Sequence, residues 1–139
     1  MMTAIVLPVT GFYASLLALL VIVLLLTVVR KRFRHRVGVG HGGHGDLQLA
    51  IRAHANAIET IPLALILLAA FEANAAPLLS LHIFGGVLLI GRLLHAWGLS
   101  HHGGVSFYRF WGTICTVTVM LGLALANIWM FFHASVLHA

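Results

Sequence analysis

Charge is scarce in this sequence, because only 8% of its 139 residues are Asp, Glu, Lys or Arg. Soluble domains usually carry about a quarter charged residues, whereas hydrophobic residues make up 61% of this chain. So few charges cannot cover a surface that faces water. The composition argues against a soluble protein and predicts an integral membrane protein, and the length predicts a single membrane domain over residues 1–139.

Cysteine and acidic residues are also rare. Cys115 is the single cysteine, which excludes a disulfide within the chain and any CxxC site. The chain has three acidic residues and eight Lys and Arg. Five of these eight lie in the run 30–36. A basic run can indicate nucleic-acid binding. Here the run follows an uncharged apolar segment directly, so we expect it to contact lipid headgroups and expect no nucleic acid as a partner.

Long apolar runs are abundant, and four of them reach the roughly 20 residues that a membrane-spanning helix needs. These runs cover residues 4–29, 47–71, 77–97 and 107–132. The first lacks a preceding basic segment and is too long for the core of a signal peptide, so we expect it to be retained. Short connections favour an up-and-down four-helix bundle, and the absence of strict alternation argues against a β-barrel.

The positions of Lys and Arg predict the orientation in the membrane. All eight lie in or near the first and third connections, residues 30–46 and 98–106, and none lies at the termini or in the second connection. Positive charge favours the cytoplasmic side. We therefore expect these two connections in the cytoplasm and both termini in the periplasm, in a bacterial inner membrane.

A polar stripe opens the second apolar run. Arg52, Asn56 and Glu59 are spaced four and then three residues apart, so on a helix they share one face. We expect this face to point into the bundle interior, with Arg92 and Arg109 as further partners of Glu59. Pro62 follows one turn later and is expected to open space between helices, because it removes a backbone hydrogen bond.

Two interpretations of this stripe carry about equal weight from the residues alone. The first is a structural network of ion pairs that ties the helices together, in which each contact contributes only about 1 kcal/mol. The second is a pocket for a charged ligand near the cytoplasmic side, since charge inside a membrane often marks a functional site. The surplus of Arg over acidic residues favours an anionic ligand.

The pattern R-x-x-x-N-x-x-E-x-x-P near the start of the second run, together with Gly91-Arg-Leu-Leu-His-Ala-Trp-Gly98 at the end of the third, resembles the MAPEG family. These are membrane-associated proteins of eicosanoid and glutathione metabolism, and the likeness is greatest to small bacterial members. The resemblance implies a homotrimer of four-helix bundles that binds glutathione as co-substrate between subunits. It further implies transferase or peroxidase activity on lipophilic electrophiles that arrive from the bilayer.

The resemblance also implies roles for individual residues. It assigns the thiolate of glutathione to Arg109, and the rest of the molecule to Arg30, Arg52, His54, Asn56 and Glu59. Arg92 and His95, at the end of the third run, are further candidates for glutathione binding. Thr60 stands where glutathione-using members often have a tyrosine, and His95 and Leu99 stand near further tyrosine positions. The alternative is therefore a non-catalytic membrane protein of the same fold, which binds lipid or joins a larger complex.

Histidines gather in the two connections that we expect in the cytoplasm: His41, His44, His101 and His102. Together with Asp46 they raise the possibility of a metal site. Their glycine-rich flanks provide no rigidity and no fixed ligand spacing, and histidines in hydrated loops are usually just solvated. We therefore expect no metal site.

Overall fold

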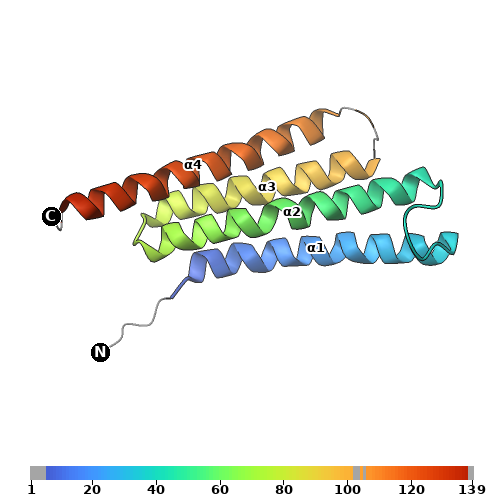
Figure 1. Cartoon of the computed structure of the whole chain (residues 1–139), viewed down its shortest axis with the longest axis horizontal. Coiled ribbons are helices and arrows are strands. Elements are labelled where there is room, and N and C mark those ends of the chain that lie inside the picture. Colours follow the sequence, from blue (N-terminus) through green and yellow to red (C-terminus); the bar gives the residue numbers. More distant parts are fainter. Residues whose placement is uncertain (1–5, 102–103, 105, 138–139) are drawn as a thin grey trace.

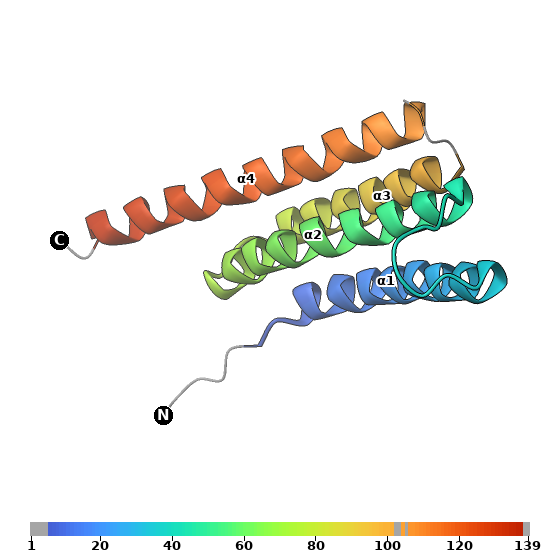
Figure 2. The same ribbon diagram turned by 45° about the vertical axis from the view of Figure 1, so that its right-hand side comes forward.

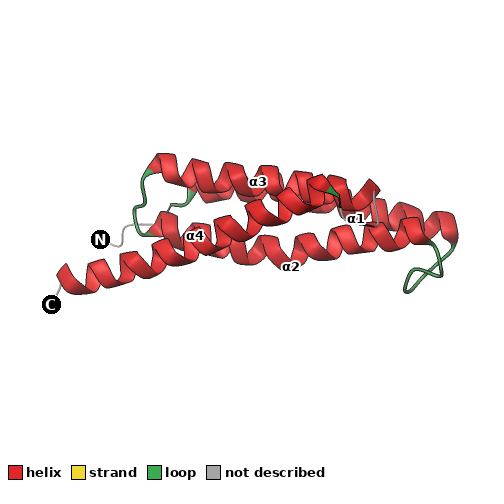
Figure 3. Cartoon of the chain, turned by 90° about the horizontal axis from the view of Figure 1, so that it is seen from above, coloured by secondary structure: helices red, strands yellow, loops and turns green. Residues whose placement is uncertain are grey.

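The computed structural model describes residues 6–101, 104 and 106–137, which form four long helices (Figure 1). They are α1 (Pro8–His35), α2 (Gly45–Ala73), α3 (Leu78–His101) and α4 (Phe107–Leu137). No strand occurs among the described residues, as Figure 3 shows. All four helices are long and apolar enough to cross a membrane, which confirms the expected all-α bundle.

The helices run up and down, with α2 and α3 in the middle. Each of these two packs against the other three helices, whereas α1 and α4 make no contact among the described residues. Figure 2 shows α1 and α4 on opposite sides of the α2–α3 pair. α1 begins and α4 ends at one end of the bundle, here the terminal end. α1 and α3 end, and α2 and α4 begin, at the other end, here the pocket end (Figure 1).

Leucine and alanine fill the space between the helices. Each helix contributes at least one fully buried leucine: Leu17, Leu47, Leu68, Leu88 and Leu123. On α2, Ala53, Ala57 and Ala64 are also fully buried, and such small residues let membrane helices approach closely. Large apolar side chains are exposed along the outer faces of all four helices, as expected of surfaces that meet lipid.

The helices at the pocket end continue beyond the apolar runs. α1 continues through the basic run to His35, and α3 continues to His101. The expected first connection, 30–46, is therefore shortened to the segment between α1 and α2, residues 36–44. Lys and Arg are good helix formers, and cations near a helix C-terminus interact favourably with its dipole. Most of the basic run therefore lies on α1 rather than in a loop.

The start of α1 is held by a carboxylate from the end of α2. Pro8 occupies the first turn, where its missing N–H costs nothing. The next two backbone groups, Val9 N–H and Thr10 N–H, donate to Glu72 Oε1 at 2.9 Å and Oε2 at 2.7 Å. These N–H groups have no partner inside the helix, and a negative charge is favourable beside them. Glu72 thereby ties α1 to α2 at the terminal end.

Candidate functional site

A pocket of about 490 Å³ opens at the pocket end between α2, α3 and α4. Its lining residues are Gly45, Gln48, Leu49, Arg52, Asn56, His95, Leu99 and Arg109. They include two guanidinium groups and no carboxylate. Guanidinium groups remain charged under nearly all conditions and match the geometry of carboxylates and phosphates. The pocket is therefore suited to an anionic ligand.

Four of the residues singled out in the sequence meet in this pocket, although they come from three helices. Arg52 and Asn56 lie one turn apart on α2, His95 comes from α3, and Arg109 comes from the first turn of α4. Helical periodicity did not indicate the last two: Arg109 was expected as a partner of Glu59 and as the thiolate ligand, and His95 as a further candidate for glutathione binding. Their convergence means that one ligand can contact all four side chains.

Arg92 lies behind the pocket and does not line it. Its side chain is only 1% exposed, and its Nη2 donates to Asn56 Oδ1 at 2.9 Å. This hydrogen bond orients the amide of Asn56, because its oxygen must face the guanidinium group. Asn56 can then donate hydrogen bonds to a ligand from its Nδ2–H groups. Arg92 is thus placed to position a pocket residue rather than to touch the ligand.

Two buried polar atoms beside the pocket have no hydrogen-bond partner within the described structure. They are Nδ1 of His95, a residue that is 4% exposed, and Nε of Arg92. Leaving a buried donor or acceptor unpaired costs about 1–3 kcal/mol. Such atoms are rare in native proteins, and they leave hydrogen-bonding capacity for a bound molecule or water.

Close contact between α3 and α4 places Arg109 beside α3. A Cβ on Gly112 would lie 2.6 Å from Gly91 O and 2.6 Å from His95 N, and a Cβ on Gly98 would lie 2.6 Å from Arg109 N. These separations are too short for any side chain, and most of the atoms involved are backbone. Glycine is therefore required here for the two helices to approach.

Other predicted site residues lie outside this pocket. Glu59 is exposed on the chain surface, and it forms no ion pair in the part of the chain that the structure describes. The expectation that the whole stripe faces the bundle interior is therefore wrong: Arg52 and Glu59 lie on nearly the same face of α2 and are both exposed, and only Asn56 between them is half-buried. Arg30 borders a separate hollow on α1, and half-buried His54 does not line the pocket.

Arg109 borders a second hollow as well. This hollow, of about 300 Å³, is lined by Ser106, Arg109, Phe110, Thr113 and Ile114 of α4 and the residue before it. Its surface is largely apolar, although three of the five residues carry polar groups, and Phe110 is exposed on the outer face of α4. Arg109 therefore stands between a polar pocket and an apolar hollow.

Gln48 and Leu49 line the pocket but were missed in the sequence, and Leu99 was named there only as standing near a tyrosine position of the family. Gln48 lies four residues before Arg52, so extending the polar stripe back by one turn would have identified it. The two leucines resemble any other apolar residue of these helices. Only the packing of α2 against α3 distinguishes them.

Pro62 lines an apolar hollow of about 320 Å³ between α1 and α2, together with Ile58 and Ala18. This agrees with the expectation that space opens between helices near this proline. Thr60, one turn beyond Asn56, donates its hydroxyl to Asn56 O at 2.8 Å. Its side chain is therefore tied to its own helix.

His44 of the first connection lies near Asp46 through His35, the last residue of α1, whereas His41 Nδ1 accepts a hydrogen bond from Gly43 N–H. His35 Nε2 lies 3.0 Å from Asp46 Oδ1, Lys31 Nζ lies 2.7 Å from Oδ2, and the rings of His35 and His44 stack. Across the described residues, no group of three His, Cys, Asp or Glu side chains has a geometry that could hold a metal ion. His102 lies outside the described residues.

Comparison with known proteins places these features in a family. Residues 10–129 match the MAPEG family. The chain is 43% identical over 121 residues to "Inner membrane protein YecN" of Escherichia coli strain K12, which covers 87% of this chain and 91% of that protein. The protein of that name from Escherichia coli O6:H1 gives the same values. The expected inner-membrane localisation is thereby confirmed. With four candidate spans and a match over most of its length, the chain belongs to the MAPEG family.

Proposed function

We propose that this protein is a membrane-bound transferase or peroxidase that binds glutathione in the pocket between α2, α3 and α4. The observation that carries the proposal is the lining of this pocket, which holds Arg52 and Arg109 but no carboxylate. Glutathione has two carboxylates and an acidic thiol, so it suits such a pocket. Membership of the MAPEG family supports the proposal, because many members use glutathione.

Each pocket residue has a role in this proposal. Arg109 stabilises the thiolate, because a nearby cation favours the charged form of a thiol. Arg52 holds a carboxylate of the peptide, and the Nδ2–H groups of Asn56 donate to its backbone. Arg92 and His95 supply the unpaired nitrogens beside the pocket, with Arg92 acting through Asn56.

The remaining predicted residues act in a second copy of the chain. Arg30, His54 and Glu59 lie outside the pocket of their own chain. In a homotrimer they complete a pocket between adjacent subunits, where Glu59 holds the ammonium group of glutathione. This assignment also explains why a carboxylate on a membrane helix is exposed in the single chain, since charge at membrane depth is costly.

The second substrate reaches Arg109 from the bilayer side. The largely apolar hollow on α4 shares Arg109 with the polar pocket. A lipophilic electrophile or hydroperoxide in this hollow lies next to the thiolate that Arg109 stabilises. Binding places both reactants in one small volume. With an electrophile such as an aryl halide, the thiolate forms the C–S bond and the halide leaves as the anion. With a hydroperoxide, the thiolate takes the outer oxygen as the O–O bond breaks, the alkoxide is protonated to the alcohol, and a second glutathione converts the resulting sulfenic acid to the disulfide and water.

Thr60 favours a second candidate, a binding protein without activity. Glutathione-using relatives often have a tyrosine here, whereas the Thr60 hydroxyl is already bonded to Asn56 O. A protein that lacks this phenol can hold an anionic amphiphile and yet not catalyse transfer. Fold alone does not decide between the two functions.

Replacing Arg109 by Ala tests the proposal. Purified protein in detergent is assayed with glutathione and an aryl halide, and glutathione binding is measured in parallel by thermal stabilisation. We expect Arg109→Ala to lower turnover by at least about tenfold, because it removes charge stabilisation from the transition state. Arg34→Ala, which removes an exposed charge on α1, should retain wild-type turnover.

Wild-type turnover in Arg109→Ala would remove Arg109 from the mechanism. A wild-type protein that is stabilised by glutathione but inactive with aryl halides and hydroperoxides would support the binding protein instead. No stabilisation and no turnover would overturn both candidates.

A further inference from the structure

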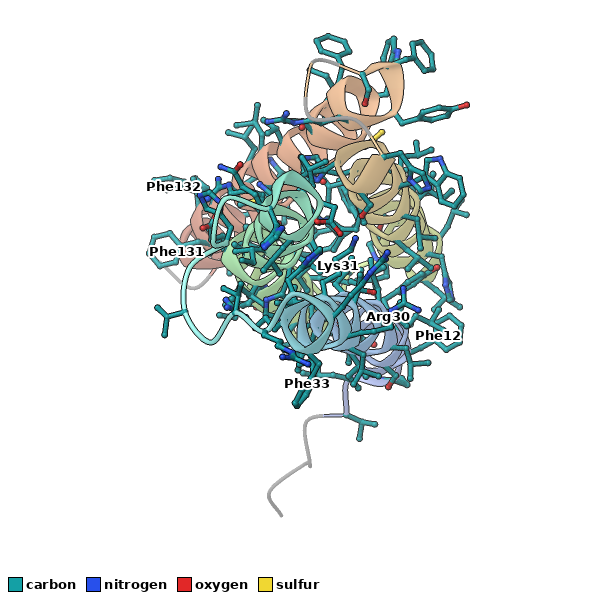
Figure 4. All side chains as sticks on the ribbon, turned by 90° about the vertical axis from the view of Figure 1, so that its right-hand side faces the viewer. Phe12, Arg30, Lys31, Phe33, Phe131 and Phe132 are labelled. Atoms are coloured by element: carbon teal, nitrogen blue, oxygen red, sulfur yellow. The ribbon has the colours of Figure 1, made fainter. Side chains whose placement is uncertain are left out.

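A separate hollow lies on the outer side of α1, where this helix reaches the pocket end. Its volume is about 390 Å³, and its lining residues are Val29, Arg32, Phe33, Arg36, Val37 and Gly38. Val29, Arg32 and Phe33 of α1 are spaced three and then one apart, and Arg36, which caps the helix, follows three residues later, so the four lie on one side of the helix. Figure 4 views the pocket end and shows Phe33 pointing away from the other helices. The hollow therefore opens outward, next to the apolar part of α1.

The first connection forms one wall of this hollow because Arg32 holds it there. Arg32 Nη1 donates to Gly38 O at 3.1 Å and to Gly40 O at 3.0 Å. The connection can turn back so tightly because Gly40, Gly42 and Gly43 have positive φ angles. As a result, Val37 lies beside α1, and the hollow has apolar side chains on both sides.

Arg36 occupies a backbone conformation that favours glycine. It ends α1 with φ 55° and ψ 40°, while Arg36 N–H donates to Phe33 O and Val37 N–H donates to Arg32 O. This is the common helix ending in which glycine usually takes the left-handed position. A non-glycine residue held in that region is strained, and such strain is often found at functional sites. The arginine side chain thus stands where backbone stability alone would select glycine.

The charge of Arg36 has no counter-ion within the described residues. Lys31, by contrast, is paired with Asp46, and Arg32 is bonded to loop carbonyls. Arg36 is exposed, and no hydrogen bond or ion pair of its side chain occurs in the described part of the chain. The hollow therefore combines an unpaired guanidinium group with an apolar wall of Val29, Phe33 and Val37.

We propose that this hollow binds one anionic phospholipid. The phosphate of the headgroup lies against the guanidinium groups of Arg36 and Arg32, and one acyl chain lies along the apolar wall. The charged headgroup and the apolar chain each find a suitable surface in neighbouring parts of one hollow. This hollow lies where the uncharged segment of α1 ends and its basic run begins. Basic residues just beyond a membrane span are placed to attract anionic lipid.

This lipid site is independent of the proposed glutathione pocket. It uses α1 and the first connection, whereas that pocket is lined by α2, α3 and α4. A failure of one proposal therefore leaves the other standing. Glutathione titration of the same preparations reports on the pocket, and lipid titration reports on the hollow.

Lipid titration of the full chain in a neutral detergent tests the proposal by thermal stabilisation. A ligand that binds only the folded state raises the melting temperature with its concentration. We expect phosphatidylglycerol to stabilise the wild-type protein, while phosphatidylcholine and inorganic phosphate have little effect. Arg36→Gln should weaken the apparent phosphatidylglycerol affinity by at least about tenfold, because it removes charge-assisted hydrogen bonds.

Two further variants separate the site from general charge and from folding. Arg34→Gln removes an equal charge from an exposed position of α1 outside the hollow, and should change the affinity by less than about twofold. Arg36→Gly should match Arg36→Gln in lipid affinity. Without lipid its melting temperature should be unchanged or higher, because glycine relieves the strain.

Four results would overturn the proposal. Equal stabilisation by phosphatidylcholine would mean that the headgroup charge is not recognised, and equal stabilisation by inorganic phosphate would mean that the acyl chain is not. Equal loss in Arg34→Gln and Arg36→Gln would indicate diffuse attraction to the whole basic run. Full affinity in Arg36→Gly would exclude Arg36 from the site.

Discussion

The two ends of the bundle use charged residues in different ways. At the terminal end, Glu72 accepts two backbone hydrogen bonds from α1, and buried Tyr13 donates its hydroxyl to His82 O at 3.2 Å. At the pocket end, buried nitrogens of Arg92 and His95 remain unpaired. At the first end the charged group, Glu72, is satisfied by the chain itself, although the neighbouring Thr10 Oγ1 is buried without a hydrogen-bond partner in the described structure. The polar groups at the second end retain capacity for a ligand.

This contrast bears on the two interpretations of the polar stripe. A structural network should resemble the terminal end, with its charges paired across helices. Among the described residues, the stripe contains one such contact, from Arg92 to Asn56. Arg52 is exposed at the pocket, and Glu59 has no ion pair in the described structure. A binding pocket therefore accounts for the stripe better than an ion-pair network does.

The largest effect on folding should come from Gly112→Ala. The added Cβ would lie 2.6 Å from two backbone atoms of α3, so α3 and α4 must separate. Overpacking of this kind costs about 1–3 kcal/mol of unfolding free energy, and separation of the helices should also displace Arg109 and abolish glutathione binding. Thermal unfolding in detergent measures the first effect, and glutathione titration measures the second.

Gly122→Ala on the same helix is the matched control. Its Cβ would meet Phe84 Cε1 at 2.9 Å, and an aromatic side chain can shift where a backbone cannot. Alanine also improves helix propensity by about 1 kcal/mol. We therefore expect near wild-type stability and binding. Equal destabilisation by the two substitutions would contradict the special requirement for glycine at Gly112.

Glu72→Gln should have the next largest effect, and only on stability. The amide retains one acceptor oxygen, so one of the two N–H groups of Val9 and Thr10 loses its partner, and the favourable charge at the helix N-terminus is lost. We expect about 1–2 kcal/mol lower unfolding free energy with unchanged glutathione affinity. A loss of affinity in this variant would show that the two ends are coupled.

Arg92→Met should have the smallest effect on stability. Replacing a buried ionic group by an apolar one of similar size is often neutral or stabilising, and Asn56 can be hydrated from the pocket. Glutathione affinity should nevertheless fall about tenfold, because the amide of Asn56 is no longer oriented. If Arg92→Met is strongly destabilised but binds glutathione normally, Arg92 stabilises the fold and does not position Asn56 for the ligand.

Much of the architecture was predictable because each helix coincides with a long apolar run. The grouping of Arg52 with Asn56 followed from helical spacing alone. The outward position of Glu59 did not, because spacing defines a shared face but not the direction in which it points. The pairing of Glu72 with Val9 and Thr10 joins residues over 60 positions apart, and only tertiary packing could reveal it. The burial of Arg92 could not be predicted either, because it also depends on tertiary packing.

The central claim is that the pocket between α2, α3 and α4 binds glutathione through Arg52 and Arg109. Equilibrium titration of the detergent-solubilised protein with glutathione tests it most directly. We predict saturable binding that is lost in the double variant Arg52→Ala, Arg109→Ala and retained in Glu72→Gln. Binding that survives the loss of both arginines, or a wild-type protein that does not bind, would contradict this account.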